Sequence, residues 1–365
     1  MPESVLVTGG AGFIGSHLVD ELLSAGHRVR VLDSLVQQVH GDSQRPDYLA
    51  EDAELIAGDV RNPEVVTGAL EGVESVVHLA ARVGVGQSMY EPAEYAAGNT
   101  AGTGVLLSAL LDHPVRKLVV ASSMSIYGEG AYTPAPATER TREQLERGEW
   151  EPRGPKGEKL EPVPTPETKE PSLASIYALT KYDQERMCLL YGAAYGVPAV
   201  ALRFFNVYGP RQALSNPYTG VLAIFAARLL NDRAPIVYED GGQRRDFIQV
   251  GDVARACRLA LERDGADGLA VNVGSGTSAS VLEIAGSLAR LLDKPIQPEL
   301  TGQFRAGDIR HCFADVSRAR ETLGFEAEVP VERGLAELAE WLEGQPATDR
   351  FDEAAAELKE RGLAR

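Results

Sequence analysis

The sequence of 365 residues has few cysteines and no long apolar run. Cys188, Cys257 and Cys312 lie far apart, and no two of them have the spacing of a metal or redox site. No apolar run approaches the ~18 residues that a membrane span needs. No charged segment followed by an apolar one opens the chain, as it would in a signal peptide. We therefore expect reduced thiols, no metal ion and a cytoplasmic location.

The chain also lacks a surplus of positive charge, because its formal net charge is −17. An acidic surface argues against nonspecific binding to nucleic acid or to an anionic membrane. Hydrophobic residues make up 44% and charged residues 24%, which excludes a largely disordered chain. The length is enough for one large domain or for two closely joined ones.

Short apolar runs alternate with helical patterns through the first half of the chain. We expect strands at 5–7, 29–32, 54–57, 75–79, 117–121 and 198–205, and helices at 13–25, 63–70, 95–112 and 175–194. Strands that alternate with helices form βαβ units and a parallel sheet. The sequence therefore predicts an α/β fold with a doubly wound sheet of the Rossmann type. A smaller C-terminal domain follows where this alternation loosens, after residue 207.

Two segments depart from this pattern. Residues 129–172 are rich in proline and charge and have no sustained apolar period, except for a short helical pattern at 141–147. We expect this insertion to be partly ordered at best, and to be either a lid over the site or a plain surface insertion. Residues 349–365 are expected to form a charged helix or a frayed end.

A glycine motif follows the first predicted strand directly. Gly9 permits a tight turn, Gly12 allows the backbone to approach a pyrophosphate, and Gly15 lets the next helix pack on the strand. That helix begins at Phe13 and Ile14, and its free N–H groups favour phosphate. A strand, a glycine turn and an amphipathic helix in this order predict a dinucleotide site.

Acidic residues after the next two strands indicate which dinucleotide binds. Asp33 can accept hydrogen bonds from the adenosine ribose, and its charge would repel a 2′-phosphate, so NAD is favoured over NADP. Asp59 can bond the adenine amine and Val60 can pack on its ring, although a plain turn aspartate is the alternative.

The run at 78–81 ends the fourth predicted strand with small residues. Leu79, Ala80 and Ala81 suit a backbone that passes close to the cofactor. We expect His78 to be a hydrogen-bonded core histidine rather than a catalytic residue.

Tyr177 and Lys181 are the candidate catalytic pair. Their i, i+4 spacing places phenol and ammonium on one face of a helix. A tyrosine titrates near 10, and a neighbouring ammonium and a nicotinamide cation both favour its phenolate form. A hydroxyl in the run from Ser122 to Tyr127, at the end of the fifth predicted strand, can share a sugar hydroxyl with Tyr177. These groups together predict hydride chemistry on an alcohol.

These motifs together resemble the extended short-chain dehydrogenase/reductases of the NAD-dependent epimerase/dehydratase family. The motifs that carry the resemblance are TGGAGFIGSHL at 8–18, HLAA at 78–81, SSMSIYG at 122–128, YALTK at 177–181, RFFNVYGPRQ at 203–212 and RRDFIQVGDVA at 244–254. The resemblance implies that Ser123 supplies the catalytic hydroxyl, that Tyr177 is the acid/base with Lys181 as its partner, and that Asn99 lies at the cofactor.

The same resemblance suggests which reaction is catalysed. Family members that eliminate water carry an Asp-Glu pair directly after the catalytic hydroxyl, where this chain has Met124 and Ser125. Neither side chain can serve as that acid or base, so dehydration is disfavoured. We expect a nucleotide-sugar 4-epimerase acting on a dTDP- or UDP-hexose. The motif at 38–41 and the insertion are similar to enzymes that epimerise dTDP-L-rhamnose.

The substrate site is expected to combine anchors for the diphosphate with looser contacts to the sugar. The residues that the family pattern implies as substrate ligands are Asn206, Arg245, Arg305 and Asp308. An arginine fork meets phosphate oxygens two at a time, and a solvated surface charge is the alternative for each. Gln87 and Ser88 are candidates for sugar hydroxyl contacts, or belong to a glycine-rich loop with none.

We expect residues 1–205 and 245–275 to bind NAD, and 206–244 and 276–345 to bind the nucleotide sugar, with a charged tail at 346–365. The apolar faces of helices 95–112 and 175–194 predict a homodimer, unless these faces pack on the sheet. Rival functions are a UDP-glucose or UDP-glucuronate 4-epimerase, a net dehydrogenase, and a nonenzymatic NAD-binding regulator on the same fold.

Overall fold

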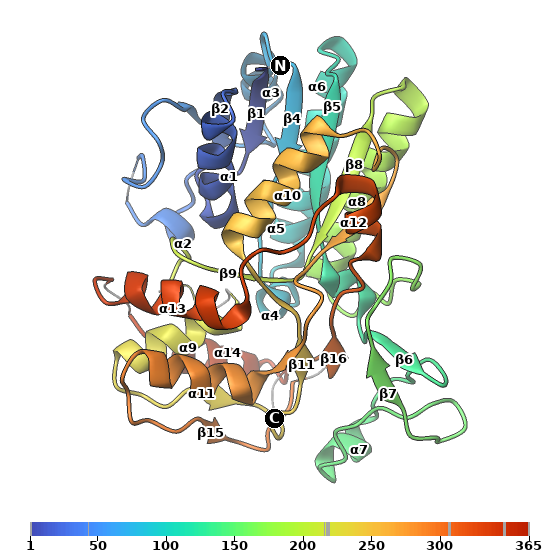
Figure 1. Ribbon diagram of the computed structural model, residues 1–365, viewed down its shortest axis with the longest axis vertical. Coiled ribbons are helices and arrows are strands. Elements are labelled where there is room, and N and C mark those ends of the chain that lie inside the picture. Colours follow the sequence, from blue (N-terminus) through green and yellow to red (C-terminus); the bar gives the residue numbers. More distant parts are fainter. Residues whose placement is uncertain are drawn as a thin grey trace.

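A parallel sheet of seven strands forms the centre of the protein in the computed structural model (Figure 1). The structure describes residues 2–42, 44–214, 216, 220–305, 308–345 and 348–363. The strands of the sheet are β1 (Ser4–Thr8), β2 (Arg28–Asp33), β3 (Glu54–Ala57), β4 (Ser75–His78), β5 (Lys117–Ser123), β8 (Ala199–Phe204) and β13 (Ala270–Val273). Each predicted strand of the first half is present within a few residues of its expected bounds.

The strand order is β13-β8-β5-β4-β1-β2-β3, with every neighbouring pair parallel. This order is that of a dinucleotide-binding sheet, with β13 added beyond β8. The strand order reverses between β1 and β4, so their carboxyl ends flank the crevice where such sheets bind ligands. The predicted doubly wound Rossmann fold is confirmed.

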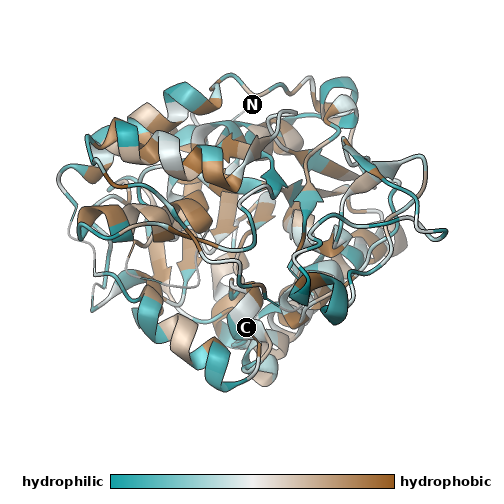
Figure 2. Cartoon of the chain, turned by 90° about the horizontal axis from the view of Figure 1, so that it is seen from below, coloured by the Kyte–Doolittle hydropathy of each residue, from teal (hydrophilic) through white to brown (hydrophobic). Residues whose placement is uncertain are grey.

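Helices cover both faces of the sheet because strand side chains alternate between them. Val5 and Val7 belong to one core cluster and Leu6 to the other. One face carries α1 (Phe13–Ser24), α10 (Val250–Glu262) and α12 (Ser317–Leu323), and the other carries α3 (Pro63–Leu70), α6 (Gly102–Asp112) and α8 (Ile176–Tyr195). Figure 2 shows hydrophobic stretches on the central strands and mixed character on the outer helices.

The predicted helix at 95–112 is not a single α-helix. It consists of α5 (Pro92–Tyr95), a π-helical segment η1 (Ala96–Ala101) and α6. The side chain of Asn99, inside η1, bonds the backbone of Arg82 and the hydroxyl of Thr180. Periodicity missed this irregularity, since π-helical turns depend on tertiary contacts of this kind and often occur at functional sites.

Several segments from the second half of the chain pack below the sheet in Figure 1, around an apolar cluster of their own. Their helices are α9 (Val221–Leu230), α11 (Val281–Leu291), α13 (Val331–Leu342) and α14 (Phe351–Glu360). Their short strands are β9 (Asn206–Tyr208), β10 (Ile236–Val237), β11 (Arg244–Arg245), β12 (Phe247–Gln249), β14 (Ala279–Ser280), β15 (Glu299–Leu300) and β16 (His311–Cys312). The tail was expected to be a charged helix or a frayed end, and residues Phe351–Glu360 form the helix α14.

The insertion at 129–172 is ordered throughout, so the expectation of partial order at best is wrong. It contains β6 (Ala131–Thr133), α7 (Arg142–Glu146) and β7 (Glu161–Val163), and β6 pairs with β7 (Figure 1). Its order comes from hydrogen bonds and ion pairs rather than from an apolar period, which is why composition did not reveal it. Among the described helices, none has the length and hydropathy needed to cross a membrane.

Candidate active site

The predicted site residues follow the carboxyl ends of neighbouring strands. Gly9 comes after β1, Leu79 comes after β4, and Asn206 begins β9 shortly after β8, while Asp33 and Ser123 end β2 and β5. Because parallel strands bring their carboxyl ends to one edge of the sheet, residues far apart in sequence meet there.

The glycine turn is packed too closely for any side chain. Gly9 has a φ of +71°, and a Cβ there would lie 2.8 Å from the backbone nitrogen of Ala80. A Cβ on Gly15 would lie 2.2 Å from the carbonyl oxygen of Gly9. Gly12 caps α1 without a side-chain hydrogen bond, and Phe13 and Ile14 open its first turn. The first turn of α1 therefore offers backbone N–H groups suited to phosphate.

Asp33 is held at the end of β2 by two backbone donors. Its carboxylate accepts from the nitrogen of Ala11 and from that of Leu35, each at 3.0 Å. His40 belongs to the short helix α2 (Gln37–His40). Its Nε2 lies 3.7 Å from Oδ1 of this carboxylate, the oxygen that accepts from Leu35. The carboxylate is thus fixed in orientation at the position where the adenosine ribose was expected.

Asp59 and Val60 face different surroundings. Asp59 forms a close ion pair with Arg61, 2.7 Å between Oδ2 and Nη2, and this hydrogen bond lowers the pKa of Asp59. Val60 is buried in the core cluster under α6. On β1 and the loop after β4, the nitrogen of Ala80 donates to Thr8 Oγ1 at 3.3 Å, which draws the run of Leu79, Ala80 and Ala81 against the glycine turn.

Tyr177 and Ser123 are brought together by the start of α8 and the end of β5. Burial raises the pKa of Tyr177, and a hydrogen bond with the Ser123 hydroxyl opposes this. Ser123 Oγ accepts from the nitrogen of Ser125 at 3.1 Å and from its hydroxyl at 2.9 Å. With both acceptor positions filled, the Ser123 hydroxyl has its proton left to offer to a neighbouring acceptor.

Lys181 lies one turn further along α8, and its hydrogen-bond partner is a neutral amide. Its ammonium donates to Gln184 Oε1 at 2.7 Å. Gln184 Nε2 in turn faces three acceptors, His78 Nε2, Thr103 Oγ1 and the carbonyl of Ala80, which fixes the amide with its oxygen toward the lysine. Burial lowers the pKa of Lys181 to about 7 and that of His78 to about 3.

His78 is a buried, hydrogen-bonded histidine, as expected. Its Nδ1 lies 2.7 Å from Thr8 Oγ1, and its Nε2 accepts from Gln184. Gln184 was not among the predicted site residues. Its signal was a polar residue three positions after Lys181, on the inward face of a helix that packs on the sheet.

Two predicted ligands hold other parts of the site in place. Ser88, in α4 (Val85–Ser88), is fully buried; its hydroxyl donates to Val85 O and accepts from the backbone nitrogen of Tyr177 at 3.0 Å. Asn99 uses its amide nitrogen for Thr180 and Arg82 and its amide oxygen for the nitrogen of Arg82. The structure therefore places both beside α8, with their polar atoms engaged.

A buried ion pair behind β5 was also missed. Glu185 accepts from Arg203 at 2.6 and 2.9 Å and from the hydroxyl of Ser122 at 2.7 Å. Arg203 Nη1 also donates to Tyr127 Oη, which donates to Asn272 Oδ1. This network links the catalytic helix α8 to β5, β8 and β13.

The predicted substrate ligands gather on the second half of the chain. Arg305 pairs with Asp308 at 3.0 Å, and Arg245 Nη2 lies 3.7 Å from the same carboxylate. Although burial opposes it, these two arginines hold the pKa of Asp308 below its ordinary value. Asn206 begins β9, and its side-chain oxygen is buried with no partner within the described part of the chain. Gln87 accepts from Gln38 and from Tyr95.

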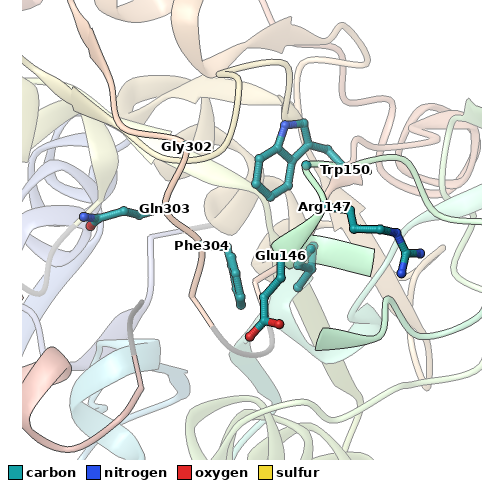
Figure 3. Close-up of a pocket in the computed structure, with 8 residues that line it drawn as sticks. Glu146, Arg147, Trp150, Gly302, Gln303 and Phe304 are labelled. Carbon is teal, nitrogen blue, oxygen red and sulfur yellow. The ribbon is translucent and has the colours of Figure 1, made fainter. Parts of the chain in front are cut away.

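An open cavity of about 510 Å³ lies between the insertion and residues 302–304 (Figure 3). Leu145 and Trp150 line it from the insertion, and Phe304 lines it from the opposite segment. None of the predicted catalytic residues lines this cavity. It adjoins the Arg305–Asp308 pair, because Phe304 directly precedes Arg305.

Comparison with known families decides how these motifs are related. The NAD dependent epimerase/dehydratase family matches residues 5–274. The chain belongs to this family. The resemblance carried by the glycine turn, the Tyr-Lys pair and the strand ends is thereby confirmed.

Relatives in this epimerase/dehydratase family match along most of the chain. The dTDP-L-rhamnose 4-epimerase of Burkholderia thailandensis is 37% identical over 93% of this chain and 95% of its own. The UDP-glucose 4-epimerase of Thermotoga maritima, solved with UDP-glucose, has a TM-score of 0.78 and 32% identity, covering 93% of this chain and 98% of that one. The Thermus thermophilus UDP-glucose 4-epimerase, solved with NAD, has a TM-score of 0.75 and 31% identity, covering 94% and 100%.

NAD is the cofactor of this epimerase, as predicted. The glycine turn fits it, since a Cβ at Gly9 or Gly15 would collide with backbone, and Gly12 leaves the start of α1 without a side-chain cap. Asp33 ends β2 with its carboxylate held by the backbone nitrogens of Ala11 and Leu35.

Proposed function

We propose that this protein is a nucleotide-sugar 4-epimerase that acts on a dTDP- or UDP-hexose. The observation that carries the proposal is the placement of Ser123, at the end of β5, beside Tyr177 of α8, with Lys181 one turn away at the same strand edge. The relative from Burkholderia favours a dTDP-linked 6-deoxyhexose, and the solved relative with UDP-glucose supports the UDP-hexose alternative.

The side chains of this site can move one proton between the sugar and the protein. Tyr177, as phenolate, takes the proton of the sugar 4-hydroxyl while Ser123 holds that hydroxyl, and the protonated Lys181 stabilises the phenolate. Bound NAD supplies the hydride acceptor and donor. The 4-keto sugar then turns over, and Tyr177 returns its proton when the 4-hydroxyl is restored with the opposite configuration.

The turnover of the sugar requires that the phosphates be held firmly and the hexose loosely. We assign the phosphate contacts to Arg245 and Arg305, with Asn206 and Asp308 as polar partners. Gln87 would border the hexose, and Ser88 would act through the backbone of Tyr177 rather than through the sugar. Met124 and Ser125 stand where a dehydratase needs an acid and a base, so dehydration is not part of this proposal.

The proposed division of labour follows the two halves of the chain. Residues 1–205 and 245–275 would bind NAD, and 206–244 and 276–345 would bind the nucleotide sugar. The return of the chain to the central sheet at β13 supports this division.

We also propose a homodimer formed through α6 and α8. Leu111 near the end of α6, and Leu179 and Leu190 on α8, leave large apolar side chains exposed. Two such helices from each subunit would bury these side chains as a four-helix bundle. The three buried free thiols agree with a cytoplasmic location.

The experiment that tests the function is incubation of the NAD-loaded protein with separate dTDP- and UDP-hexoses, followed by NMR of the configuration at C4. An epimerase gives two C4 epimers and no net change in nicotinamide absorbance. Stoichiometric NADH release would instead identify a dehydrogenase. No conversion with any sugar, while NAD still binds, would favour a nonenzymatic NAD-binding regulator.

A further inference from the structure

The insertion at 129–172 is joined to the loop 308–311 along its edges. At its start, the nitrogen of Gly130 donates to the carbonyl of His311 at 2.8 Å. Towards its end, the nitrogen of Thr165 donates to the carbonyl of Phe313 at 2.8 Å. The insertion therefore does not hang from one hinge, as a simple lid would.

Arg140 links the insertion to two other segments at once. Its Nη1 donates to Glu239 at 2.7 Å, and its Nη2 donates to the backbone carbonyl of Asp308 at 2.7 Å. Its side chain is only 5% exposed. A buried guanidinium bonded on both sides fixes the separation between Glu239 and Asp308.

Arg310 completes the same network from the other side. It pairs with Glu239 at 3.0 Å, with Glu151 of the insertion at 2.6 Å and with Asp240 at 2.7 Å. His311 Nε2 lies 3.0 Å from Glu151 as well. Because Glu239 lies between Arg140 and Arg310, loss of either arginine leaves a buried carboxylate poorly compensated.

The opposite side of the loop 308–311 carries the proposed phosphate contacts. Arg245 donates to the carbonyls of Arg310, at 2.9 Å, and of Ile309. The side chain of Asp308 holds Arg305. The four residues 308–311 thus belong both to the insertion network and to the diphosphate clamp.

We propose that Arg140 is a positioning residue for nucleoside diphosphate binding, and that the insertion braces the loop that orients Arg245 and Arg305. This inference rests on the proposed function, because the clamp needs a diphosphate to hold. It assigns the insertion a role that is neither lid nor plain surface. The cavity of Figure 3 lies between Trp150 of the insertion and Phe304 of the segment that precedes Arg305.

The test compares Arg140→Met with the NAD-loaded wild type. Binding of dTDP and of UDP is measured by calorimetry, and kcat and KM are measured with the sugar that is turned over. We expect Arg140→Met to weaken the binding of whichever diphosphate the wild type binds, and to raise KM, by about 10-fold or more. The expected kcat stays within about 2-fold, because Tyr177 and Ser123 do not contact the network.

Two further variants separate positioning from charge and from general damage. Arg140→Lys keeps the charge but cannot make both bonds, so its binding should remain at least about 5-fold weaker. Arg142→Met removes an exposed guanidinium of the same segment that pairs only locally with Glu146, and should bind like the wild type.

The outcomes distinguish the two proposals. Wild-type affinity of Arg140→Met, or full recovery with Arg140→Lys, would overturn the positioning role and leave the proposed function intact. A fall in kcat at unchanged KM would also overturn it, because that pattern indicates a smaller folded fraction. Failure of the wild type to bind either diphosphate would overturn the proposed function and this inference with it.

Discussion

Lys181 and Arg310 are both buried cations, but their surroundings differ. The partner of Lys181 is the neutral amide of Gln184, and burial lowers the pKa of Lys181 to about 7. Arg310 is surrounded by three carboxylates, and their charges raise its pKa against the effect of burial. The first cation can therefore respond to a new negative charge such as a phenolate, whereas the charge of the second is already compensated by its neighbours.

The largest effect should come from the acid/base residue itself. We expect Tyr177→Phe to lower kcat by about 10³-fold or more while NAD binding is kept, because no other group on this face takes the proton. Turnover and NAD fluorescence titration measure the two properties. Tyr195→Phe, which removes an exposed hydroxyl at the end of the same helix, is the matched control. Substantial activity of Tyr177→Phe would contradict its assignment as base.

The neutral partner of Lys181 can be changed without touching the phenol. Gln184→Leu removes the acceptor of the ammonium, and we expect kcat to fall by about 10-fold or more. The pKa of Lys181 should fall further. Because activity is lost when Lys181 is deprotonated, this loss should then occur at a lower pH. Gln184→Glu adds a negative charge, so the same loss should move to higher pH.

The pH profile of kcat/KM separates this effect from damage to the fold. A structural defect would scale the whole profile without moving it. Arg142→Met, at an exposed residue of the insertion, should leave the profile unchanged. If both Gln184 variants shift the profile in the same direction, the charge of the side chain at position 184 does not set the protonation of Lys181.

A smaller effect is expected at the ribose carboxylate. Asp33→Asn keeps the shape of the side chain but loses its charge, so NAD should bind about 10-fold more weakly and NADP should be rejected less strongly. Dissociation constants for both cofactors measure this. Glu54→Gln, at an exposed ion pair on the neighbouring strand, is the control. An unchanged ratio of the NAD and NADP dissociation constants would show that Asp33 does not contact the ribose.

The smallest effect concerns the charged network in acid. The hydrogen bond from His311, with the charge of Arg310, lowers the pKa of Glu151 from 4.5 to about 2. A carboxyl group with a lowered pKa stabilises the folded state when the pH is above the ordinary pKa of that group. This contribution is lost as the pH falls from about 4.5 toward 2. The emission of Trp150 in a Trp341→Phe background should follow this loss. The same transition in Glu151→Gln would exclude Glu151 as its origin.

The sequence predicted the parts of the molecule that follow local patterns. The glycine turn after β1, the strands of the first half and the Tyr177–Lys181 spacing can all be predicted from short segments. The buried contacts of Gln184, Glu185 and Arg140 could not be predicted, because each depends on residues that only the fold brings near. Composition also misled for the insertion, since its order comes from paired charges and not from an apolar core.

The hydrogen bond from the Tyr177 backbone to Ser88 joins the loop that contains α4, beside the proposed sugar site, to the first turn of α8. A substitution in that loop made to admit a different hexose would also displace the phenol. Changes of specificity at α4 should therefore carry a cost in rate, and compensating substitutions would be sought near residue 177 rather than among the sugar contacts.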